Sequence, residues 1–393
     1  MMVETILMEC LKGIGRMFAN PLFYWIAFLV IGTGYQRVLQ ERAHFGFKIF
    51  NVFSELKQTW VISLVFSILI SGLTLGAGMV FTHETILILS IVIIFLSITF
   101  SLSMLSASYT IGITYMIVLL TFIIFGSRTS PKSDVLTNVN FTGLVILLGI
   151  FLIVEAFLVG RVKRNDTFPQ LSQSERGSWI GKQHIKKLSF IPFFVLIPTG
   201  LIQPFADYWP FFTIGEDGTY GILLVPFIVG FDHVIHGRSA EQTTTYLIKS
   251  ISLLGFIVLC LAVGSIYIPW LSMIAVLIAI LGREYINYRH RMFNKEKSAY
   301  FNHMDDGLKV LSIIPGSPAD RLGILVGETI DKVNDQKVNS AQQFYETLQN
   351  SGAYFKITLI DDANEMRFVQ SAIYDNDHHE LGIVFTNQPY KTH

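Results

Sequence analysis

The sequence predicts a polytopic α-helical membrane bundle followed by a small α+β domain, and three observations support this fold class. Hydrophobic residues make up 51% of the 393 residues and charged residues only 15%, whereas a soluble domain usually carries about 25%. The charge deficit falls within residues 1–282, where long apolar runs recur. The stretch 308–385 is instead polar and has the pattern of short strands. Because the formal net charge is +0, no nucleic-acid partner is expected.

The first segment, residues 1–18, is predicted to be an amphipathic helix. Its apolar residues recur at helical spacing, while Glu4, Glu9, Lys12 and Arg16 lie among them. Such a helix can lie in the plane of the membrane interface. Packing of the helix against the membrane bundle is an equally good interpretation of the same pattern.

The transmembrane bundle is expected to occupy residues 19–282 with about eight or nine segments. Asn20 and Pro21 suit an N-cap and a first helical position. The apolar run 21–35 has 15 residues, whereas a spanning helix needs roughly 20. If this run crosses the membrane, there are nine segments and the N-terminus lies outside. If it is re-entrant or peripheral, there are eight segments and both chain ends lie inside, which is the arrangement we favour. The other segments are predicted at 59–81, 86–104, 107–126, 142–160, 188–204, 219–231, 246–264 and 266–282.

Loop charges predict the side of the membrane on which each loop lies, because cytoplasmic loops carry an excess of Lys and Arg. The loop 161–187 holds seven Lys and Arg against two acidic residues, a net charge of +5. The loop 205–218 is acidic and has no Lys or Arg. Placing 161–187 inside also puts 36–58 and the basic segment 283–304 inside. The C-terminal domain is therefore predicted to be cytoplasmic, with 283–304 as a basic linker.

Polar residues in the apolar segments form no complete catalytic or metal-binding motif. Glu155 lies about one helical turn from a predicted membrane surface, where structural pairing with Arg161 is the favoured interpretation. His233 and His236 could place two imidazoles near one helix face and bind a metal, but a solvated loop pair is favoured. No His-Glu-x-x-His, Gly-x-Ser-x-Gly or phosphate-loop pattern occurs. No catalytic residue, metal or cofactor is therefore expected.

The C-terminal domain, residues 305–388, has the short alternating elements of an α+β fold. Pro315 and Gly316 end its first strand, Ser317 and Pro318 begin a short helix, and Gly323 ends that helix. Ser340 suits the N-cap of a second helix. Strands are predicted at 308–314, 328–333, 354–360, 366–372 and 381–385, and the second helix at 341–348.

The motifs of this domain resemble a PDZ domain. The matching segments are Pro315-Gly316-Ser317-Pro318-Ala319, Gly323-Ile324, Gly327-Glu328-Thr329-Ile330 and Val333-Asn334. The strand with Leu381-Gly382-Ile383 comes last, as in the permuted PDZ domains of site-2-type proteases. Asp335 departs from the family, which usually has Gly after the Asn and so a more stable turn.

The resemblance implies a groove in which a partner segment adds as a strand beside residues 382–385. The residues expected to bind the peptide are the carboxylate loop and two residues of the facing helix: His379, Glu380, Leu381, Gly382, Ile383, Phe344 and Leu348. The alternative is that Phe344 and Leu348 belong to the domain core and that the domain binds by another face.

A bundle of about eight helices with one C-terminal PDZ domain and no protease motif resembles the MinJ family of Gram-positive bacteria. The family implies a non-catalytic membrane adaptor in division-site selection. It links a DivIVA-like coiled-coil scaffold of poles and septum to the MinD-like ATPase, which with MinC blocks misplaced Z-rings.

The same resemblance implies a multi-pass protein of the cell membrane, enriched at the division septum and poles. It also implies contacts with other divisome membrane proteins and with membrane lipid, and self-association stays open. The permuted type of PDZ domain suggests an alternative, which is an intramembrane protease or a PDZ-containing regulator of a membrane protease. Taken without the resemblance, the residues support a membrane-anchored peptide- or protein-binding adaptor.

Overall fold

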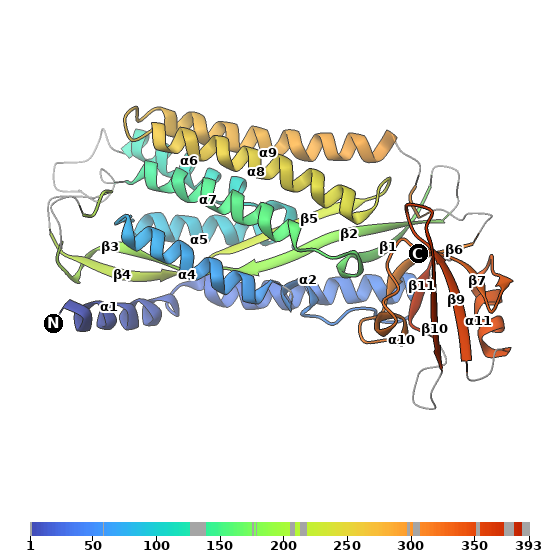
Figure 1. The fold of residues 1–393 in the computed structure, drawn as a ribbon. Helices are drawn as coiled ribbons and strands as arrows, with labels where there is room; N and C mark the ends of the chain where they lie inside the picture. Colours follow the sequence, from blue (N-terminus) through green and yellow to red (C-terminus); the bar gives the residue numbers. More distant parts are fainter. Residues whose placement is uncertain are drawn as a thin grey trace.

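The computed structural model describes residues 2–57, 59–125, 139–174, 177, 179–204, 209–212, 218–296, 299–301, 307–350, 354–372 and 381–386. They form an elongated body in which helices and long strands run side by side (Figure 1). We call the described part up to residue 296 the bundle, and residues 307–386 the C-terminal domain. The end of the bundle on which the C-terminal domain sits is the domain end, and the opposite one is the far end.

Helices dominate the bundle, and strands dominate the C-terminal domain. The bundle contains α1 (Met2–Met17), α2 (Pro21–Phe45), α3 (Ser54–Lys57), α4 (Trp60–Gly76), α5 (His83–Ser97), the 3₁₀ turn η1 (Leu102–Leu105), α6 (Ala107–Phe125), α7 (Phe141–Gly160), the 3₁₀ turn η2 (Arg164–Asp166), β1 (Phe168–Gln173), β2 (Trp179–Phe190), β3 (Phe193–Ile202), β4 (Tyr220–Val225), β5 (Ile228–Ile235), α8 (Ala240–Gly264) and α9 (Leu271–Glu296). The C-terminal domain contains β6 (Leu308–Ile313), α10 (Pro318–Arg321), β7 (Thr329–Val333), β8 (Gln336–Lys337), α11 (Ala341–Asn350), β9 (Tyr354–Ile360), β10 (Met366–Ala372) and β11 (Ile383–Phe385).

Five helices of the described chain, α2, α6, α7, α8 and α9, are long and apolar enough to cross a membrane. The apolar helices α4 and α5 are shorter, at 17 and 15 residues. Together with the PDZ-like motifs of the C-terminal domain, these helices confirm the predicted fold class. The predicted linker 283–304 begins inside α9, which stays helical to Glu296.

The first apolar run is part of a helix of 25 residues, α2, rather than a segment of 15. As predicted, Asn20 caps it, since the Asn20 Oδ1 accepts the Leu22 N–H at 2.9 Å. The helix α1 packs on β3 and β4 toward the far end, and α2 runs from there to the domain end (Figure 1). By length and hydropathy, α2 is suited to crossing a membrane, which a run of 15 residues would not be. The contacts of α1 with β3 and β4 agree with the interpretation in which this helix packs on the bundle.

The predicted helices at 188–204 and 219–231 are wrong, because both segments form antiparallel strands. Strand β2 pairs with β5, and β3 pairs with β4. Pro192, Pro198 and Pro226 interrupt the two segments, and each would remove a hydrogen bond from a helix interior. At 17 and 13 residues, both predicted segments also fall short of the roughly 20 residues of a spanning helix.

The four strands form one bent hairpin that runs along the helices. Strand β2 continues into β3 at Ile191–Pro192, and β4 continues into β5 at Pro226–Phe227, so both sides bend at the same level. The Ile191 N–H donates to the Phe227 carbonyl at 2.8 Å, which carries the ladder across the bend. The hairpin thus extends from the far end to the domain end (Figure 1).

Helix α4 supplies hydrogen bonds to the outer edge of this hairpin. The Thr59 hydroxyl, just before α4, donates to the Leu188 carbonyl at 2.7 Å. The Ser67 hydroxyl donates to the Pro192 carbonyl, and the Thr74 hydroxyl donates to the Phe194 carbonyl at 2.5 Å. In return, the Phe194 N–H donates to the Ser71 hydroxyl at 3.0 Å. Because these hydroxyls recur about every helical turn, they lie in one row, which we call the α4 hydroxyl ladder.

Side chains of two other helices contact the second side of the hairpin. The Arg16 guanidinium of α1 donates to the Ile222 carbonyl of β4 at 2.9 Å. The Asn294 amide of α9 donates to the Val234 carbonyl of β5 at 2.8 Å, and the His290 Nε2 contacts the same carbonyl at 2.9 Å. The hairpin therefore exchanges hydrogen bonds with helices on both of its sides.

Glu155 pairs with Arg283 of α9, not with Arg161 as predicted. One Glu155 carboxylate oxygen lies 2.5 Å from the Arg283 Nη2, and the Ser106 hydroxyl donates to the other at 2.7 Å. Both charged side chains are almost completely buried, at 0% and 1% exposure. The Arg161 guanidinium lies instead over the Phe157 ring. The pair joins α7 to α9, which supports the structural role expected for Glu155.

The C-terminal domain is a sheet in the order β10-β9-β7-β6-β11, with β8 paired to β7. The predicted caps are confirmed, since Ser317 caps α10 and the Ser340 hydroxyl accepts the Gln343 N–H of α11 at 3.2 Å. Asn334 and Asp335 have φ of 49° and 64°, which forms the turn between β7 and β8. Asp335 therefore adopts the backbone region in which the PDZ family usually places Gly.

Thr74→Val tests the α4 hydroxyl ladder. The substitution keeps the side-chain shape but removes the hydrogen bond from Thr74 to the partly buried Phe194 carbonyl, which should lower the free energy of unfolding by about 0.5–1.5 kcal/mol. Thermal unfolding of the detergent-solubilised protein measures the change. Thr33→Val is the matched control, because Thr33 is equally buried and its hydroxyl bonds only carbonyls of its own helix. Equal losses in the two variants would contradict a special role for the ladder.

Candidate functional site

The candidate peptide-binding site is the outer edge of β11, the last strand of the sheet. The Ile314 N–H of the neighbouring chain segment donates to the Gly382 carbonyl at 2.9 Å, so the polar groups of residue 382 point toward β6. Because successive residues of a strand point their polar groups to opposite sides, those of Ile383 face away from β6. Ile383 thus presents a backbone edge to which another strand could add.

Gly382 holds the loop that leads into this strand. Its φ is +79°, a conformation that side chains rarely adopt. A Cβ at this position would lie 2.4 Å from the Ser317 Cβ, so α10 packs too closely for any side chain. The Leu381 carbonyl accepts the Ala319 N–H at 3.0 Å, which fixes the loop against the start of α10. The Pro-Gly-Ser-Pro-Ala motif therefore positions the loop that precedes the binding edge.

The side chain of Tyr345 occupies the binding edge. Its hydroxyl donates to the Ile383 carbonyl at 3.2 Å, and its ring lies 6.4 Å from the ring of Phe385. Since the Ile383 carbonyl is an acceptor that an added strand would use, an incoming peptide must displace this hydroxyl. The site is closed at this point in the described conformation.

The predicted site residues lie in three different environments. Leu381, Gly382 and Ile383 lie in and before β11, as expected. Phe344 and Leu348 are fully buried in the domain core, where the alternative interpretation placed them. His379 and Glu380 lie outside the described residues.

Sequence reasoning missed Tyr345, which follows Ala341 at a spacing of i, i+4. Ala341 and Tyr345 are both only partly buried against the domain core, whereas Phe344 and Leu348 form the buried stripe of the same helix. The i, i+4 spacing could have identified this second stripe.

The opposite face of β11 packs on the bundle. Val384 forms a buried apolar cluster with Ile49, Phe50 and Phe168. The rings of Phe50 and Phe168 lie 4.9 Å apart, edge to face, and provide an aromatic surface for the strand. The strand with the candidate binding edge therefore also forms part of the contact between the C-terminal domain and the bundle.

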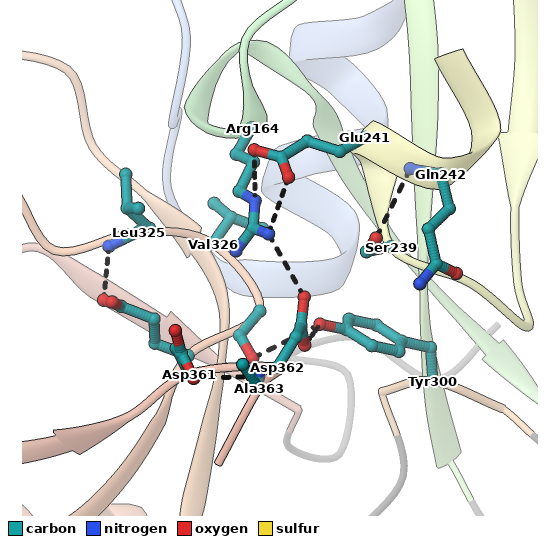
Figure 2. A network of polar contacts seen from close by, with 12 residues as sticks. Arg164, Ser239, Glu241, Gln242, Tyr300, Leu325, Val326, Asp361, Asp362 and Ala363 are labelled. Atoms are coloured by element: carbon teal, nitrogen blue, oxygen red, sulfur yellow. Dashed lines mark hydrogen bonds and ion pairs between the residues drawn. The ribbon is translucent and has the colours of Figure 1, made fainter. Parts of the chain in front are cut away.

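A polar network also joins the two parts (Figure 2). The Arg164 guanidinium lies 2.8 Å from Glu241 of α8 and 3.3 Å from Asp362, in the turn between β9 and β10. Asp362 also accepts the hydroxyl of Tyr300. Burial and the hydrogen bond to Asp362 raise the pKa of Tyr300, so this phenol stays a donor. One arginine thus links the end of α7, the start of α8 and the C-terminal domain.

Backbone and apolar contacts extend this docking. The Gln183 amide of β2 donates to the Leu311 carbonyl of β6 at 2.8 Å. The Gly181 N–H donates to the Phe301 carbonyl at 3.0 Å. Leu171 of β1 belongs to the same apolar cluster as the domain core. The C-terminal domain is therefore docked on β1 and β2 by shared core and shared hydrogen bonds.

His233 and His236 do not form the solvated pair that the sequence suggested. His233 is 5% exposed, and its ring contacts the rings of Phe231 and His290. His236 lies beyond the end of β5, where its carbonyl accepts the Tyr300 N–H at 2.7 Å. Within the part of the chain that the structure describes, no three His, Cys, Asp or Glu side chains gather as metal ligands.

The comparisons with known proteins agree with this architecture. The PDZ domain family matches residues 309–360, which span β6 to β9. The cell division topological determinant MinJ of Bacillus subtilis (strain 168) is 31% identical over 383 residues, covering 96% of this chain and 95% of the relative. The chain belongs to the MinJ family. Probable MinJ proteins of Lacticaseibacillus paracasei and Lacticaseibacillus casei (strain BD-II) are each 28% identical over 80 residues, 20% of this chain and 22% of theirs.

Arg164→Gln tests how this MinJ-family protein holds its PDZ domain. Loss of the ion pairs with Glu241 and Asp362 should speed amide hydrogen exchange in β9 and β10 by up to about fivefold, because partly exposed pairs contribute about 1 kcal/mol or less. Mass spectrometry of the full chain measures the exchange. Arg161→Gln removes a neighbouring charge whose contact is with Phe157 and serves as control. Unchanged exchange in Arg164→Gln would show that the apolar contacts alone set the docking.

Tyr345→Phe tests the closed binding edge. Without the hydroxyl, an extended peptide selected by display against the full-length protein should bind roughly two- to tenfold more tightly, since one hydrogen bond contributes about 0.5–1.5 kcal/mol. Fluorescence anisotropy of the labelled peptide gives the affinity. Tyr354→Phe is the control, because the Tyr354 hydroxyl bonds Gln370 on β10. Weaker binding to Tyr345→Phe would mean that the hydroxyl contacts the peptide instead of competing with it.

Proposed function

We propose that this protein is a non-catalytic membrane adaptor in division-site selection. It bridges a DivIVA-like coiled-coil scaffold of poles and septum to a MinD-like ATPase that, with MinC, inhibits Z-rings. The observation that carries the proposal is the 31% identity to a cell division topological determinant over nearly the whole chain. That relative's name describes a determinant of position and not an enzyme, which supports an adaptor.

The structure supplies two separate surfaces for such an adaptor. One is the strand edge at Ile383, where a partner segment can pair with backbone groups. The side chains around this edge would then determine which partner segment binds. The other is the apolar outside of the bundle, whose helices α2, α6, α7, α8 and α9 are suited to lipid and to other membrane proteins of the divisome. An adaptor with both can hold a soluble partner at the membrane.

We further propose that the PDZ domain lies in the cytoplasm. The segments 36–58 and 161–187, whose described parts include the end of α2, α3, β1 and part of β2, carry the basic residues that the positive-inside rule assigns to the cytoplasm. Both proposed partners act on the cytoplasmic side, so the PDZ domain and the partners would share one compartment. Enrichment at septum and poles follows from recruitment by the scaffold.

Removing residues 299–393 tests the role of the PDZ domain. The truncated chain should still insert in the membrane, because the five apolar helices are retained, but a fluorescent fusion should lose its enrichment at the division site. Microscopy of dividing cells gives the distribution, and membrane fractionation checks insertion. Normal septal enrichment and normal division in the truncated form would contradict the proposal for the PDZ domain.

Gly382→Val is a milder variant for the same question. Valine cannot adopt the φ of +79° without strain, and its side chain meets Ser317, so the loop before β11 must shift while the chain stays complete. The same loss of enrichment is expected. Gly316→Val is the control, because Gly316 also has a positive φ, at 81°, but nothing lies within 4 Å of its added Cβ.

A further inference from the structure

A pocket of about 370 Å³ lies between the bundle and the PDZ domain. The bundle contributes the segment after α2, the η2 turn and the strands β1 and β2, and the PDZ domain contributes the end of β6 and the start of α10. Its apolar walls include Phe50, Phe168, Ile314 and Pro315. The pocket is therefore a property of the docked arrangement, because neither part encloses it alone.

The charged side chains of the pocket are three lysines and two aspartates, namely Lys48, Lys57, Lys187, Asp166 and Asp320. Both aspartates already accept backbone N–H groups. Asp320 accepts that of Gly316 at 2.8 Å, and Asp166 accepts that of Lys163 at 3.4 Å. Lys48 contacts the Asn51 side chain at 3.0 Å. Cations exceed anions among the lining groups, which favours a ligand with negative charge.

Lys187 is the buried member of the group. Its side chain is 2% exposed, and its Nζ lies 5.4 Å from the centroid of the Phe168 ring. Burial lowers the pKa of Lys187 to about 8, while Asp166 and Glu55 favour its charged form and Arg37 opposes it. An ammonium group held in so dry a place is costly unless anions lie nearby. Asp166 and Glu55 supply such carboxylates, and an anion in the pocket would also lie beside this ammonium group.

The pocket lies where apolar helices of the bundle end. Helix α2 ends at Phe45, α4 begins at Trp60 and α7 ends at Gly160, and the pocket-lining residues 48–57 and 165–168 follow or precede these ends directly. Trp60 is 55% exposed at the start of α4, a position typical of the membrane interface. If these helices cross the membrane, the pocket therefore lies close to the lipid phosphates.

We propose that this pocket binds the phosphate group of a glycerophospholipid headgroup, with Lys48, Lys57 and Lys187 as its cationic partners. Basic residues beside the cytoplasmic membrane surface, on which the proposed function places the PDZ domain, attract anionic headgroups, and the apolar walls accommodate the adjoining glycerol and chain. Free phosphate esters share this chemistry, so the test separates the two sources. A bound headgroup touches both parts of the pocket and therefore strengthens the docking of the PDZ domain on the bundle.

The experiment compares ligands on the full-length protein in a neutral detergent. Short-chain phosphatidylglycerol, phosphatidylcholine of equal chain length and soluble glycerol phosphate are titrated separately, and thermal unfolding and native mass spectrometry report binding. Phosphatidylglycerol should bind most tightly. In the double variant Lys48→Gln, Lys57→Gln its affinity should fall by roughly thirtyfold, since each lysine near an anionic headgroup contributes on the order of 1 kcal/mol.

The control is the double variant Lys163→Gln, Lys186→Gln, which removes the same charge outside the pocket. Lys186 precedes Lys187 on β2 and so points to the opposite face of the strand. The control should bind phosphatidylglycerol as the wild type does. Equal losses in the two double variants, or no binding of phosphatidylglycerol to the wild type, would overturn the proposal. Equally tight binding of glycerol phosphate would assign the pocket to a soluble phosphate ester.

Discussion

The need to satisfy backbone hydrogen bonds along the β2–β5 hairpin determines much of this structure. A strand edge beside apolar helices meets no water, and each unsatisfied N–H or C=O there costs several kcal/mol. The α4 hydroxyl ladder meets this need from Thr59 to Thr74, and its hydroxyls contact Leu188, Pro192 and Phe194. The position of α4 is therefore set by hydrogen bonds as well as by packing, as Ser and Thr hydroxyls can do in apolar helices.

The same hairpin determines where the PDZ domain sits. Strand β2 leaves the helices at the domain end and there pairs with β1, and Gly181 and Gln183 contact Phe301 and Leu311. Strand β6 is consequently buried on both faces, by its own core and by the bundle. Arg164 adds a charged link from two helices to the turn at Asp362. Because β2 contacts Thr59 through Leu188 and the C-terminal domain through Gln183, the α4 hydroxyl ladder and the docking surface share one strand.

The sequence predicted most of the PDZ domain but only part of the bundle, for physical reasons. Caps such as Asn20, Ser317 and Ser340 are local signals, and the structure confirms them. The hairpin was missed because hydropathy reports burial and does not distinguish a buried strand from a helix, although Pro192 and Pro226 argued against helices. The pairing of Glu155 with Arg283 joins residues far apart in sequence, so no local pattern announces it. Tyr345 was missed because it lies outside the apolar stripe that Phe344 and Leu348 form on α11.

The constraints on β11 connect the candidate binding edge to the rest of the molecule. Ile383 and Phe385 face the domain core, Val384 faces Phe50 and Phe168 of the bundle, and Tyr345 covers the outer edge. A strand of three residues thus contacts the domain core, the bundle and Tyr345 at once. A peptide that displaces Tyr345 would therefore act on a strand already fixed by the bundle. Docking therefore holds the candidate binding edge in one position relative to the helices of the bundle, because Val384 of the same strand packs on the bundle.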